Sequence, residues 1–525
     1  MIFRSPMPDV EIPDRDFTSY VFENTSRWLE KAALIDASTG RTLTYAQLVN
    51  GVRAVAANLA ARGLHKGQVV ALDSPNLPEY ALAFHGIASA GGIVTTVNPL
   101  FTAEELGKQL ADSHARFLIT VPPLLAKARA AAALSSIEEI FVMGEAEGAT
   151  PFAALLAAGA PAVNVPIDPA TDIVVMPYSS GTTGLPKGVM LTHRNLVANV
   201  CQMLPVEPCD QHDVLCGVLP FFHIYGMIVV MSRGLRVGAT IVTLPRFELE
   251  AFLGMFQNYG VTRANLVPPI ILALAKHPLV ERYNLSRLRW VMSGAAPLGP
   301  DVQAACEARI GCSVRQGYGL TETSPVTHTV PPPPAAQKAG CVGPPIPNTE
   351  VKIVDLVTGQ TLGPGEDGEV WIRGPQVMKG YFNNTEATRN MITPDGWLRS
   401  GDIGHCDEDG YLTIVDRAKE LIKYKGFQVA PAELEAVLLR HPAIADAAVI
   451  GIPDEEAGEV PMAFIVRSHD ITADDVAAWL AEHVAPYKKV RRVEFRESIP
   501  KSASGKILRR VLKAELAAEP ARAKA

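Results

Sequence analysis

A loop rich in hydroxyl groups and glycines, residues 178–188, carries the densest chemistry in this 525-residue sequence. It reads Tyr-Ser-Ser-Gly-Thr-Thr-Gly-Leu-Pro-Lys-Gly and follows a strand-like apolar run at residues 173–178. Glycines let backbone N–H groups approach an anion, while the hydroxyls and Lys187 add donors and a positive charge. These groups suit a polyphosphate chain. The spacing is not that of a Walker A loop, because Pro186 stands where that loop needs glycine.

A second cluster, residues 316–323, combines an aromatic ring, two glycines, a hydroxyl and a carboxylate. Tyr318 is suited to stacking on a base, Thr321 to binding a phosphate oxygen, and Glu322 to holding Mg²⁺, which prefers oxygen ligands. The alternative is a glycine-rich turn in which Thr321 caps the start of a helix. The cluster alone does not decide between the two.

Three later segments bring charges onto loops. Asp402, in residues 399–404 between strand-like runs, can grip a ribose diol, although aspartate before a strand is also ordinary. Residues 416–426 carry four basic side chains at an expected domain boundary, or form a solvated charge run. Lys506, on a small-residue loop at 500–507, can reach a phosphate, or belongs to a flexible tail.

The elements that position these residues alternate between strand-like and helical stretches from about residue 43 to residue 330, which predicts α/β layers. The loop at 178–188 is expected to join two strands, and Thr192 to cap a helix starting near His193. Short strands with tight turns at 349–411 predict a β-rich subdomain. Helices are expected near 431–440 and 473–484, and disorder only at 515–525.

Composition excludes several classes of protein. The net charge of −7 argues against nonspecific nucleic-acid binding. Seven scattered cysteines form no CxxC pair, so unpaired thiols in a reducing cytoplasm are expected. The spacing of Cys201, Cys209 and His212 matches no zinc pattern. The first residues lack the apolar core of a signal peptide. The apolar stretch at 80–97 predicts a buried helix and strand rather than a membrane span.

Taken in order, the five segments resemble the motifs of the adenylate-forming superfamily, which includes acyl- and aryl-CoA synthetases, peptide-synthetase adenylation domains and luciferases. The resemblance runs from about residue 43 to residue 510. Residues 220–226 (Pro-Phe-Phe-His-Ile-Tyr-Gly) and 419–435 are most similar to the 4-coumarate–CoA ligase family.

The resemblance implies an α/β fold with a large N-terminal domain, residues 1–416, made of two α/β layered subdomains and a β-rich subdomain. A small mobile α+β C-terminal domain, residues 417–525, would rotate between two half-reactions. The implied substrates and cofactors are a carboxylic acid, ATP, Mg²⁺ and CoA. The acid attacks the α-phosphorus of ATP, and CoA then displaces AMP from the acyl-adenylate.

Residue roles follow by the same resemblance. The catalytic residues would be Lys506, His223, Thr321 and Glu322, with Glu322 also the Mg²⁺ ligand. The nucleotide would contact Ser179, Ser180, Gly181, Thr182, Thr183, Lys187, Gln316, Gly317, Tyr318, Thr321, Asp402 and Arg417. The CoA would contact Arg246, Lys425 and Gly426.

The implied acid pocket contains His223, Tyr225, Val229, Met292, Ala295, Gly317, Gly319, Val326, Lys419, Lys423 and Gln428. Most of these are apolar or small, which suits a flat aryl ring with a short unsaturated arm. Val229 stands where plant enzymes of the family carry a more polar residue. Cinnamate and medium-chain fatty acids therefore remain alternatives to 4-coumarate.

Other activities stay open at this stage: a ligase that loads a carrier protein, an amino-acid-adenylating module, and a catalytically inactive nucleotide-binding protein. Residues 221–227 offer no acidic group for a substrate ammonium, which disfavours the amino-acid module. The expected protein is a cytoplasmic monomer or homodimer that binds no nucleic acid and has no membrane span.

Overall fold

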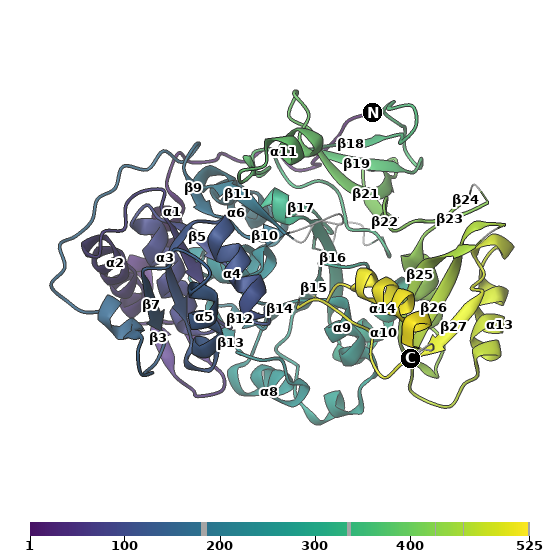
Figure 1. Cartoon of the computed structure of the whole chain (residues 1–525), viewed down its shortest axis with the longest axis horizontal. Helices are drawn as coiled ribbons and strands as arrows, with labels where there is room; N and C mark the ends of the chain where they lie inside the picture. Colours follow the sequence, from purple (N-terminus) through teal and green to yellow (C-terminus); the bar gives the residue numbers. More distant parts are fainter. Residues whose placement is uncertain (180–185, 333–337, 426, 455, 504, 523–525) are drawn as a thin grey trace.

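The computed structural model describes residues 1–179, 186–332, 338–425, 427–454, 456–503 and 505–522. Strands in this part of the chain form four sheets, which Figure 1 shows as two α/β layers, a smaller sheet above them and a separate C-terminal unit. The predicted fold is therefore confirmed: an α/β protein with two layered subdomains, a β-rich subdomain and a small C-terminal domain.

The first sheet includes, at its edge, the two strands that flank the hydroxyl-rich segment of the sequence. Its parallel strands, in spatial order, are β9 (Ile173–Val175), β5 (Ile93–Thr96), β4 (Val69–Leu72), β6 (Ala115–Thr120), β7 (Glu139–Val142) and β8 (Thr150–Pro151). Beyond β9 lie the antiparallel strands β11 (Lys187–Thr192), β10 (Tyr178–Ser179) and β20 (Gly380–Tyr381). The accompanying helices are α2 (Tyr45–Ala61), α3 (Pro78–Ser89), α4 (Ala103–Asp112) and α5 (Leu125–Ala132).

The second sheet carries the walls of the pocket described below. Its order is β17 (Val326–Thr329), β16 (Ser313–Gly319), β15 (Trp290–Ser293), β14 (Arg263–Leu266), β12 (Val214–Gly217), β13 (Thr240–Thr243), β2 (Ala32–Asp36) and β3 (Thr42–Thr44). Its helices are α1 (Phe17–Phe22), α6 (His193–Val206), the π-helical η4 (Tyr225–Ser232), α7 (Arg233–Arg236), α8 (Leu249–Tyr259), α9 (Pro268–Lys276) and α10 (Pro300–Ile310). A sheet that takes strands from residues 32–44 and 214–329 is not visible from local sequence patterns.

The two remaining sheets are smaller. The β-rich subdomain contains β1 (Phe3–Arg4), β18 (Glu350–Val354), β19 (Gly368–Arg373), β21 (Leu398–Cys406), β22 (Leu412–Arg417) and the helix α11 (Thr385–Met391). The C-terminal domain contains β23 (Ile422–Tyr424), β24 (Phe427–Val429), β25 (Ile444–Asp454), β26 (Gly458–Arg467) and β27 (Arg492–Phe495), with α12 (Pro431–Leu439), α13 (Ala473–His483) and α14 (Arg509–Arg522).

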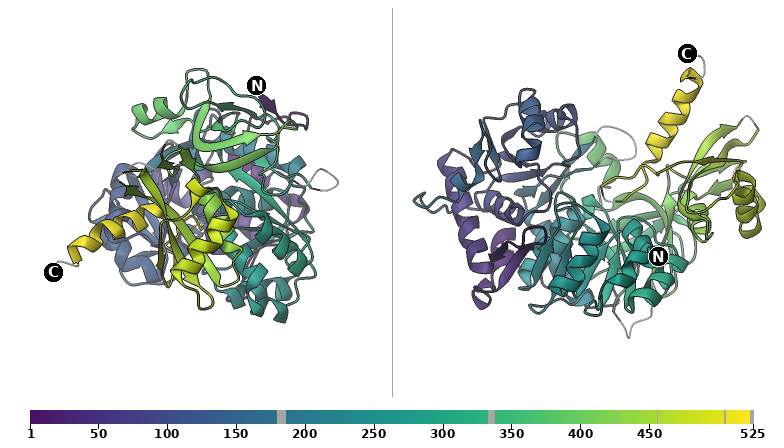
Figure 2. Two further views of the ribbon diagram at one scale, coloured as in Figure 1. Left: turned by 90° about the vertical axis from the view of Figure 1, so that its right-hand side faces the viewer. Right: turned by 90° about the horizontal axis from the view of Figure 1, so that it is seen from below.

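Local predictions can now be compared with the structure. Thr192 caps α6 by accepting a hydrogen bond from the Asn195 N–H at 3.2 Å, as expected. The stretch at 80–97 forms the buried α3 and β5. The expected disorder at 515–525 is wrong for residues 515–522, which continue α14; Figure 2 shows this helix extending away from the rest of the molecule. Alanine-rich sequence has high helix propensity, and this outweighs its low complexity.

The two α/β layers share one hydrophobic core. Tyr80 of α3 packs edge-to-face on Phe221, with ring centroids 5.8 Å apart. Asn76 donates to the carbonyls of Gly217 (2.9 Å) and Leu219 (2.7 Å) and accepts from the Phe221 N–H (2.8 Å). Because buried backbone groups need partners, these bonds fix the path of the segment that leads to His223.

Candidate active site

A pocket of about 530 Å³ lies where the second sheet meets η4 and the C-terminal domain. It is lined by Glu207, His223, Ile224, Tyr225, Val229, Met292, Ser293, Gly294, Ala295, Gly317, Tyr318, Gly319, Leu320, Thr321, Pro325, Val326 and Lys506. Most of the predicted acid-binding residues are therefore brought together, and the catalytic candidates His223, Thr321 and Lys506 lie beside them.

Two glycines allow the pocket walls to come this close. A Cβ on Gly226, at the start of η4, would lie 2.3 Å from the carbonyl oxygen of Pro220. A Cβ on Gly319, at the end of β16, would lie 1.9 Å from the carbonyl oxygen of Pro325. Only glycine fits at such backbone contacts, so these residues set the spacing between the walls.

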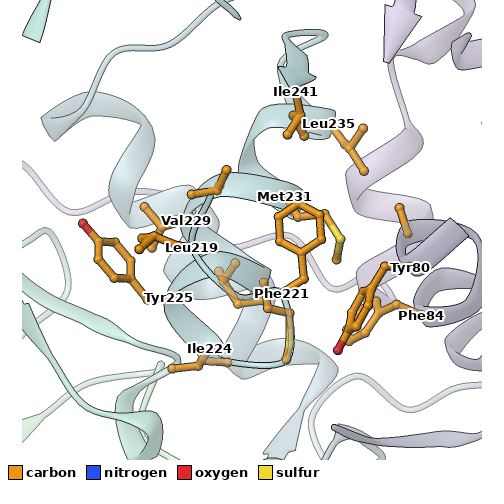
Figure 3. Packing of buried hydrophobic residues seen from close by; sticks show 14 of the residues in the cluster. Tyr80, Phe84, Leu219, Phe221, Ile224, Tyr225, Val229, Met231, Leu235 and Ile241 are labelled. Carbon is orange, nitrogen blue, oxygen red and sulfur yellow. The ribbon is translucent and has the colours of Figure 1, made fainter. Parts of the chain in front are cut away.

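Tyr225 and His223 form one side of the pocket. The Tyr225 hydroxyl donates to the Met292 carbonyl at 3.2 Å, and Figure 3 shows it pointing away from the apolar group of Phe221, Tyr80 and Phe84. His223 Nδ1 accepts from the Tyr225 N–H at 3.3 Å. Burial, with a smaller contribution from Lys506, lowers the pKa of His223 to about 3. The imidazole is therefore neutral near pH 7, which suits a group that faces a substrate carboxylate.

Lys506 reaches the pocket from the C-terminal domain. Its loop docks beside α9, where a Cβ on Gly505 would lie 3.2 Å from a Val267 methyl carbon. A second contact between the domains is the hydrogen bond from Lys276 Nζ to the Leu439 carbonyl at 3.0 Å. Burial and then the neighbouring Arg417 lower the pKa of Lys506. Two cations placed side by side in a half-buried site suit an anionic ligand such as a phosphate.

Asp402 is the centre of the predicted ribose site. It is 5% exposed, accepts from the Tyr318 hydroxyl at 2.5 Å and lies 3.4 Å from Arg417 Nε. Burial raises the pKa of Asp402, and Arg417 opposes that rise. The expectation that Asp402 lies between strands is wrong, since it belongs to β21 and faces Arg417 of β22. This antiparallel register pairs Asp402 with Arg417, and Lys506 is near enough to oppose the rise in the pKa of Asp402 as well.

Glu322 forms a separate polar centre with the first sheet. Ser179 Oγ and the Tyr381 hydroxyl each donate to Glu322 Oε1 at 2.9 Å, and Lys187 Nζ lies 5.1 Å from the Tyr381 ring centroid. Within the described residues no group of three His, Cys, Asp or Glu side chains could hold a metal. One oriented, buried carboxylate nevertheless fits Mg²⁺, which commonly takes one or two protein carboxylates and completes its shell with substrate phosphates and water.

Thr321 opens the short 3₁₀ helix η6 (Thr321–Thr323). The alternative in which Thr321 caps a helix is wrong, because Leu320 occupies the cap position and its N–H bonds to Thr323 Oγ1 at 2.9 Å. The Thr321 hydroxyl is left to face the pocket.

Several predicted residues do not line the pocket. Gln316 is buried and donates to the Leu298 carbonyl at 3.2 Å, so it supports β16 from behind. Arg246 is exposed and lies 3.9 Å from Glu248. The hairpin of β23 and β24 places Lys423, Lys425 and Gln428 on an exposed surface, where Lys425 pairs with Glu456, and Lys419 lies on the segment between the last two sheets. Ser180, Gly181, Thr182, Thr183 and Gly426 lie outside the described residues.

Glu207 is a charged pocket residue that sequence reasoning missed. It follows α6 and precedes Pro208, a pattern typical of an exposed turn, yet its side chain is 2% exposed. Glu207 Oε2 accepts from Arg233 Nη1 at 2.6 Å, and Arg233 is fully buried. The one available signal was an arginine in the otherwise apolar run at 224–235, since a buried arginine requires an acidic partner.

Comparisons with known proteins identify the family of this chain. The model of the AMP-binding enzyme family matches residues 21–382, and that of the AMP-binding enzyme C-terminal domain matches residues 433–506. The chain is 45% identical to 4-coumarate–CoA ligase 5 of Oryza sativa over 98% of both chains. It is 46% identical to 4-coumarate–CoA ligase 2 of Nicotiana tabacum, over 99% of this chain and 98% of the relative.

Among solved structures, an anthranilate CoA ligase in complex with anthranoyl-AMP superposes with a TM-score of 0.89 at 27% identity, covering 97% of this chain and 99% of the other. ATP-bound MatB from Rhodopseudomonas palustris superposes with a TM-score of 0.87 at 29% identity, covering 96% of this chain and 99% of the MatB chain. The chain belongs to the AMP-binding enzyme family, and so to the adenylate-forming superfamily. Within it, the chain is similar over nearly its whole length to 4-coumarate–CoA ligases, as the sequence motifs predict.

Proposed function

We propose that this enzyme joins an aryl acid of the cinnamate or 4-coumarate type to CoA. Its class is established by the family and the full-length relatives: it is an AMP-forming carboxylic acid–CoA ligase that uses ATP, Mg²⁺ and CoA. The observation that carries the aryl substrate is the pocket itself, which Tyr225 and the glycine-containing strand end at 317–319 line together with Lys506.

In the first half-reaction the acid attacks the α-phosphorus of ATP, which brings two anions together. Lys506 would hold both the carboxylate and the phosphate oxygens, and its ammonium would stabilise the charge that develops between them. Thr321 would donate to the α-phosphate. The neutral His223 would position the carboxylate without adding a competing charge.

The nucleotide would be held by groups from three sheets. Asp402, supported by Arg417, would accept from the ribose hydroxyls, and Tyr318 would lie along the adenine. Lys187, with Ser179 and the rest of the hydroxyl-rich loop, would hold the β- and γ-phosphates. Glu322 would bind Mg²⁺, which neutralises phosphate charge when present.

In the second half-reaction the CoA thiol displaces AMP. We propose that the C-terminal domain, from Arg417 onward, rotates between the two steps and presents Lys425 and Gly426 to the CoA, while Arg246 contacts the CoA nucleotide. The observed arrangement, with Lys506 in the pocket, is the one that we assign to adenylation.

No helix within the described residues is long and apolar enough to cross a membrane. We propose a cytoplasmic monomer or homodimer that acts on small molecules and binds no nucleic acid.

One panel tests the substrate: AMP release with cinnamate, 4-coumarate, ferulate, benzoate and octanoate, each with and without CoA. We expect CoA-dependent release to be fastest with a cinnamate-type acid. Fastest turnover with octanoate would instead identify a medium-chain fatty acid ligase. Acyl-AMP formation without transfer to CoA would indicate an enzyme that loads a carrier protein.

A further inference from the structure

The inner end of the acid pocket is charged rather than apolar. Glu207 lines the pocket and bonds to the fully buried Arg233, which also donates from Nε to the Val229 carbonyl at 3.0 Å. Val229 therefore offers an apolar side chain to the substrate while its backbone helps to hold a charged group next to it. Position 229 thus has no polar side chain, and the neighbouring Glu207 supplies a polar group to the pocket instead.

Glu207 lies away from the reacting carboxylate. Its Oε1 accepts from Thr329 Oγ1, and Thr329 pairs with Gly317 across β16 and β17. Gly317 is two residues before Gly319, and thus about 7 Å farther along the strand from the Thr321 end. Charge effects agree: burial and then Glu207 raise the pKa of Tyr225, whereas burial and then Lys506 lower the pKa of His223.

The Glu207 carboxylate has unused capacity to accept a hydrogen bond. Oε2 has a short bond from Arg233, but Oε1 has a single contact, 3.4 Å from Thr329 Oγ1, among the bonds found in the described residues. Ser293 also lines the pocket, and its hydroxyl is buried with no hydrogen-bond partner in that part of the chain. A buried polar group without a full set of partners costs free energy unless a ligand or water completes the set.

The surrounding charges decide what kind of ligand group fits. Two buried guanidinium groups, those of Arg233 and Arg315, are near the Glu207 carboxylate. The Nη2 atom of each arginine has no hydrogen-bond partner among the described residues. Arg233 Nη1 donates to Glu207 Oε2 at 2.6 Å, so the carboxylate already acts as a hydrogen-bond acceptor here. The ligand group that complements its second oxygen is therefore a donor.

We propose that Glu207 is a specificity-determining residue that selects acids whose far end carries a hydroxyl group able to donate to its carboxylate. This inference rests on the proposed aryl acid ligase function and makes it narrower. A 4-hydroxylated ring meets the requirement. Unsubstituted cinnamate, a 4-methoxy ring and a fatty acid leave the carboxylate without its donor.

The test measures kcat/KM for thioester formation with 4-hydroxycinnamate, cinnamate and 4-methoxycinnamate. In the unmodified enzyme we expect the hydroxylated acid to be preferred by about tenfold or more, the range for a hydrogen bond to a charged group. In Glu207→Gln this preference should fall at least tenfold, with most of the loss confined to the hydroxylated acid. Preference for cinnamate in the unmodified enzyme would overturn the inference.

Asp73→Asn is the matched control. Asp73 is also a buried carboxylate, 3.0 Å from Lys127 Nζ, but it belongs to the first sheet and does not line the pocket. We expect it to lower stability without changing the preference. If Glu207→Gln reduced kcat/KM for all three acids by one factor, its role would be structural and the inference would be wrong.

Glu207→Gln leaves Arg233 without its counter-charge, so a second variant guards against misfolding. Glu207→Asp keeps the ion pair and withdraws the carboxylate by one methylene, and it too should reduce the preference for the hydroxylated acid. An unchanged preference would overturn the inference. Absence of thioester with every acid in the unmodified enzyme would instead refute the proposed function.

Discussion

The acid pocket and the nucleotide grip are built in different ways. The walls of the pocket come mainly from η4, β15 and β16, which belong to one subdomain and share one core. The nucleotide grip combines Glu322 and Tyr381 with Asp402 and with Lys506 of the C-terminal domain. The pocket is thus formed before the substrate arrives, whereas the grip is complete only when the C-terminal domain is in place. Changes in the first should alter the choice of acid, and changes in the second should separate the two half-reactions.

The largest effect is expected from Lys506→Ala. Loss of the ammonium should slow adenylation by about 10²–10³-fold or more, since a preorganised charge at the reacting atoms is removed. Thioester formation from supplied acyl-AMP should be nearly unchanged, because we propose that this step uses the rotated C-terminal domain. ATP–pyrophosphate exchange and CoA transfer are measured separately.

Lys501→Ala provides the control for that experiment. Lys501 lies on the same loop but pairs with Asp446 of the C-terminal domain at 2.6 Å. It should retain adenylation. Equal impairment of both half-reactions in Lys506→Ala would mean that the nucleotide grip is needed for thioester formation as well as for adenylation.

Asp402→Asn tests the part of the grip that stays with the N-terminal domain. Removing its charge should raise the KM for ATP by about 10–100-fold, the range for a lost charge-assisted hydrogen bond. The ranking of acids should stay the same. Asp367→Asn is the control. Asp367 is an exposed carboxylate that contacts His405, which lies on the same strand, β21, as Asp402. A changed ranking of acids would show that grip and pocket are coupled.

Gly319→Ala tests the rigidity of the pocket. Its new methyl group would collide with the Pro325 carbonyl, so a backbone shift is required, at an expected cost of about 1–3 kcal/mol in the free energy of unfolding. The kcat/KM for the acid should fall about tenfold, in keeping with a strain of that size. Gly254→Ala, in α8, meets nothing closer than 3.9 Å and should leave both values unchanged. Full activity of Gly319→Ala would mean that the walls adapt.

Arg246→Glu is expected to have a smaller effect, confined to the second half-reaction. An exposed charge contributes up to about 1 kcal/mol, so the KM for CoA should rise several-fold. ATP–pyrophosphate exchange should be unaffected. Arg282→Glu, another exposed arginine, serves as the control. An unchanged KM for CoA would remove Arg246 from the site.

The pH dependence of adenylation should follow Lys506. Adenylation needs the protonated ammonium, and burial beside Arg417 lowers its pKa from the ordinary value for lysine. Activity should therefore be retained at lower pH and lost as pH rises through that lowered pKa. The alkaline limb of the ATP–pyrophosphate exchange profile should lie below pH 10.5, the usual lysine value, and should change when Lys506 is replaced by arginine. If the alkaline limb were unchanged in the arginine variant, the group that titrates there would not be Lys506.

Much of the grip could be predicted because each part lies in a compact segment. The spacing of Thr321 and Glu322 and the loop carrying Lys506 are visible without the fold, since glycines and small residues leave a local pattern around them. The helical end of α14 was missed, because alanine-rich sequence is equally typical of helices and of low-complexity tails.

A second part of the site could not be predicted from the sequence, as Lys423, Lys425 and Gln428 show. Their segment resembles the family closely, yet the strands that carry them lie on an exposed surface of the C-terminal domain in this arrangement. Where such residues meet the rest of the protein depends on the orientation of a whole domain, which local sequence does not encode. Their roles stay predictions until the half-reactions are separated.

The sequence by itself determined the class of enzyme. It also predicted roles for a hydroxyl-rich loop in phosphate binding, for Glu322 in Mg²⁺ binding, for Asp402 in ribose binding and for Lys506 in catalysis. Only the tertiary structure decided what lies at the inner end of the acid pocket. Glu207 and Arg233 are separated by 26 residues in the chain and are joined only when α6 and η4 pack together. Locally, only the arginine in an apolar run indicates such an ion pair. Its acidic partner leaves no local pattern, because burial, rather than the identity of either residue, gives the pair its strength.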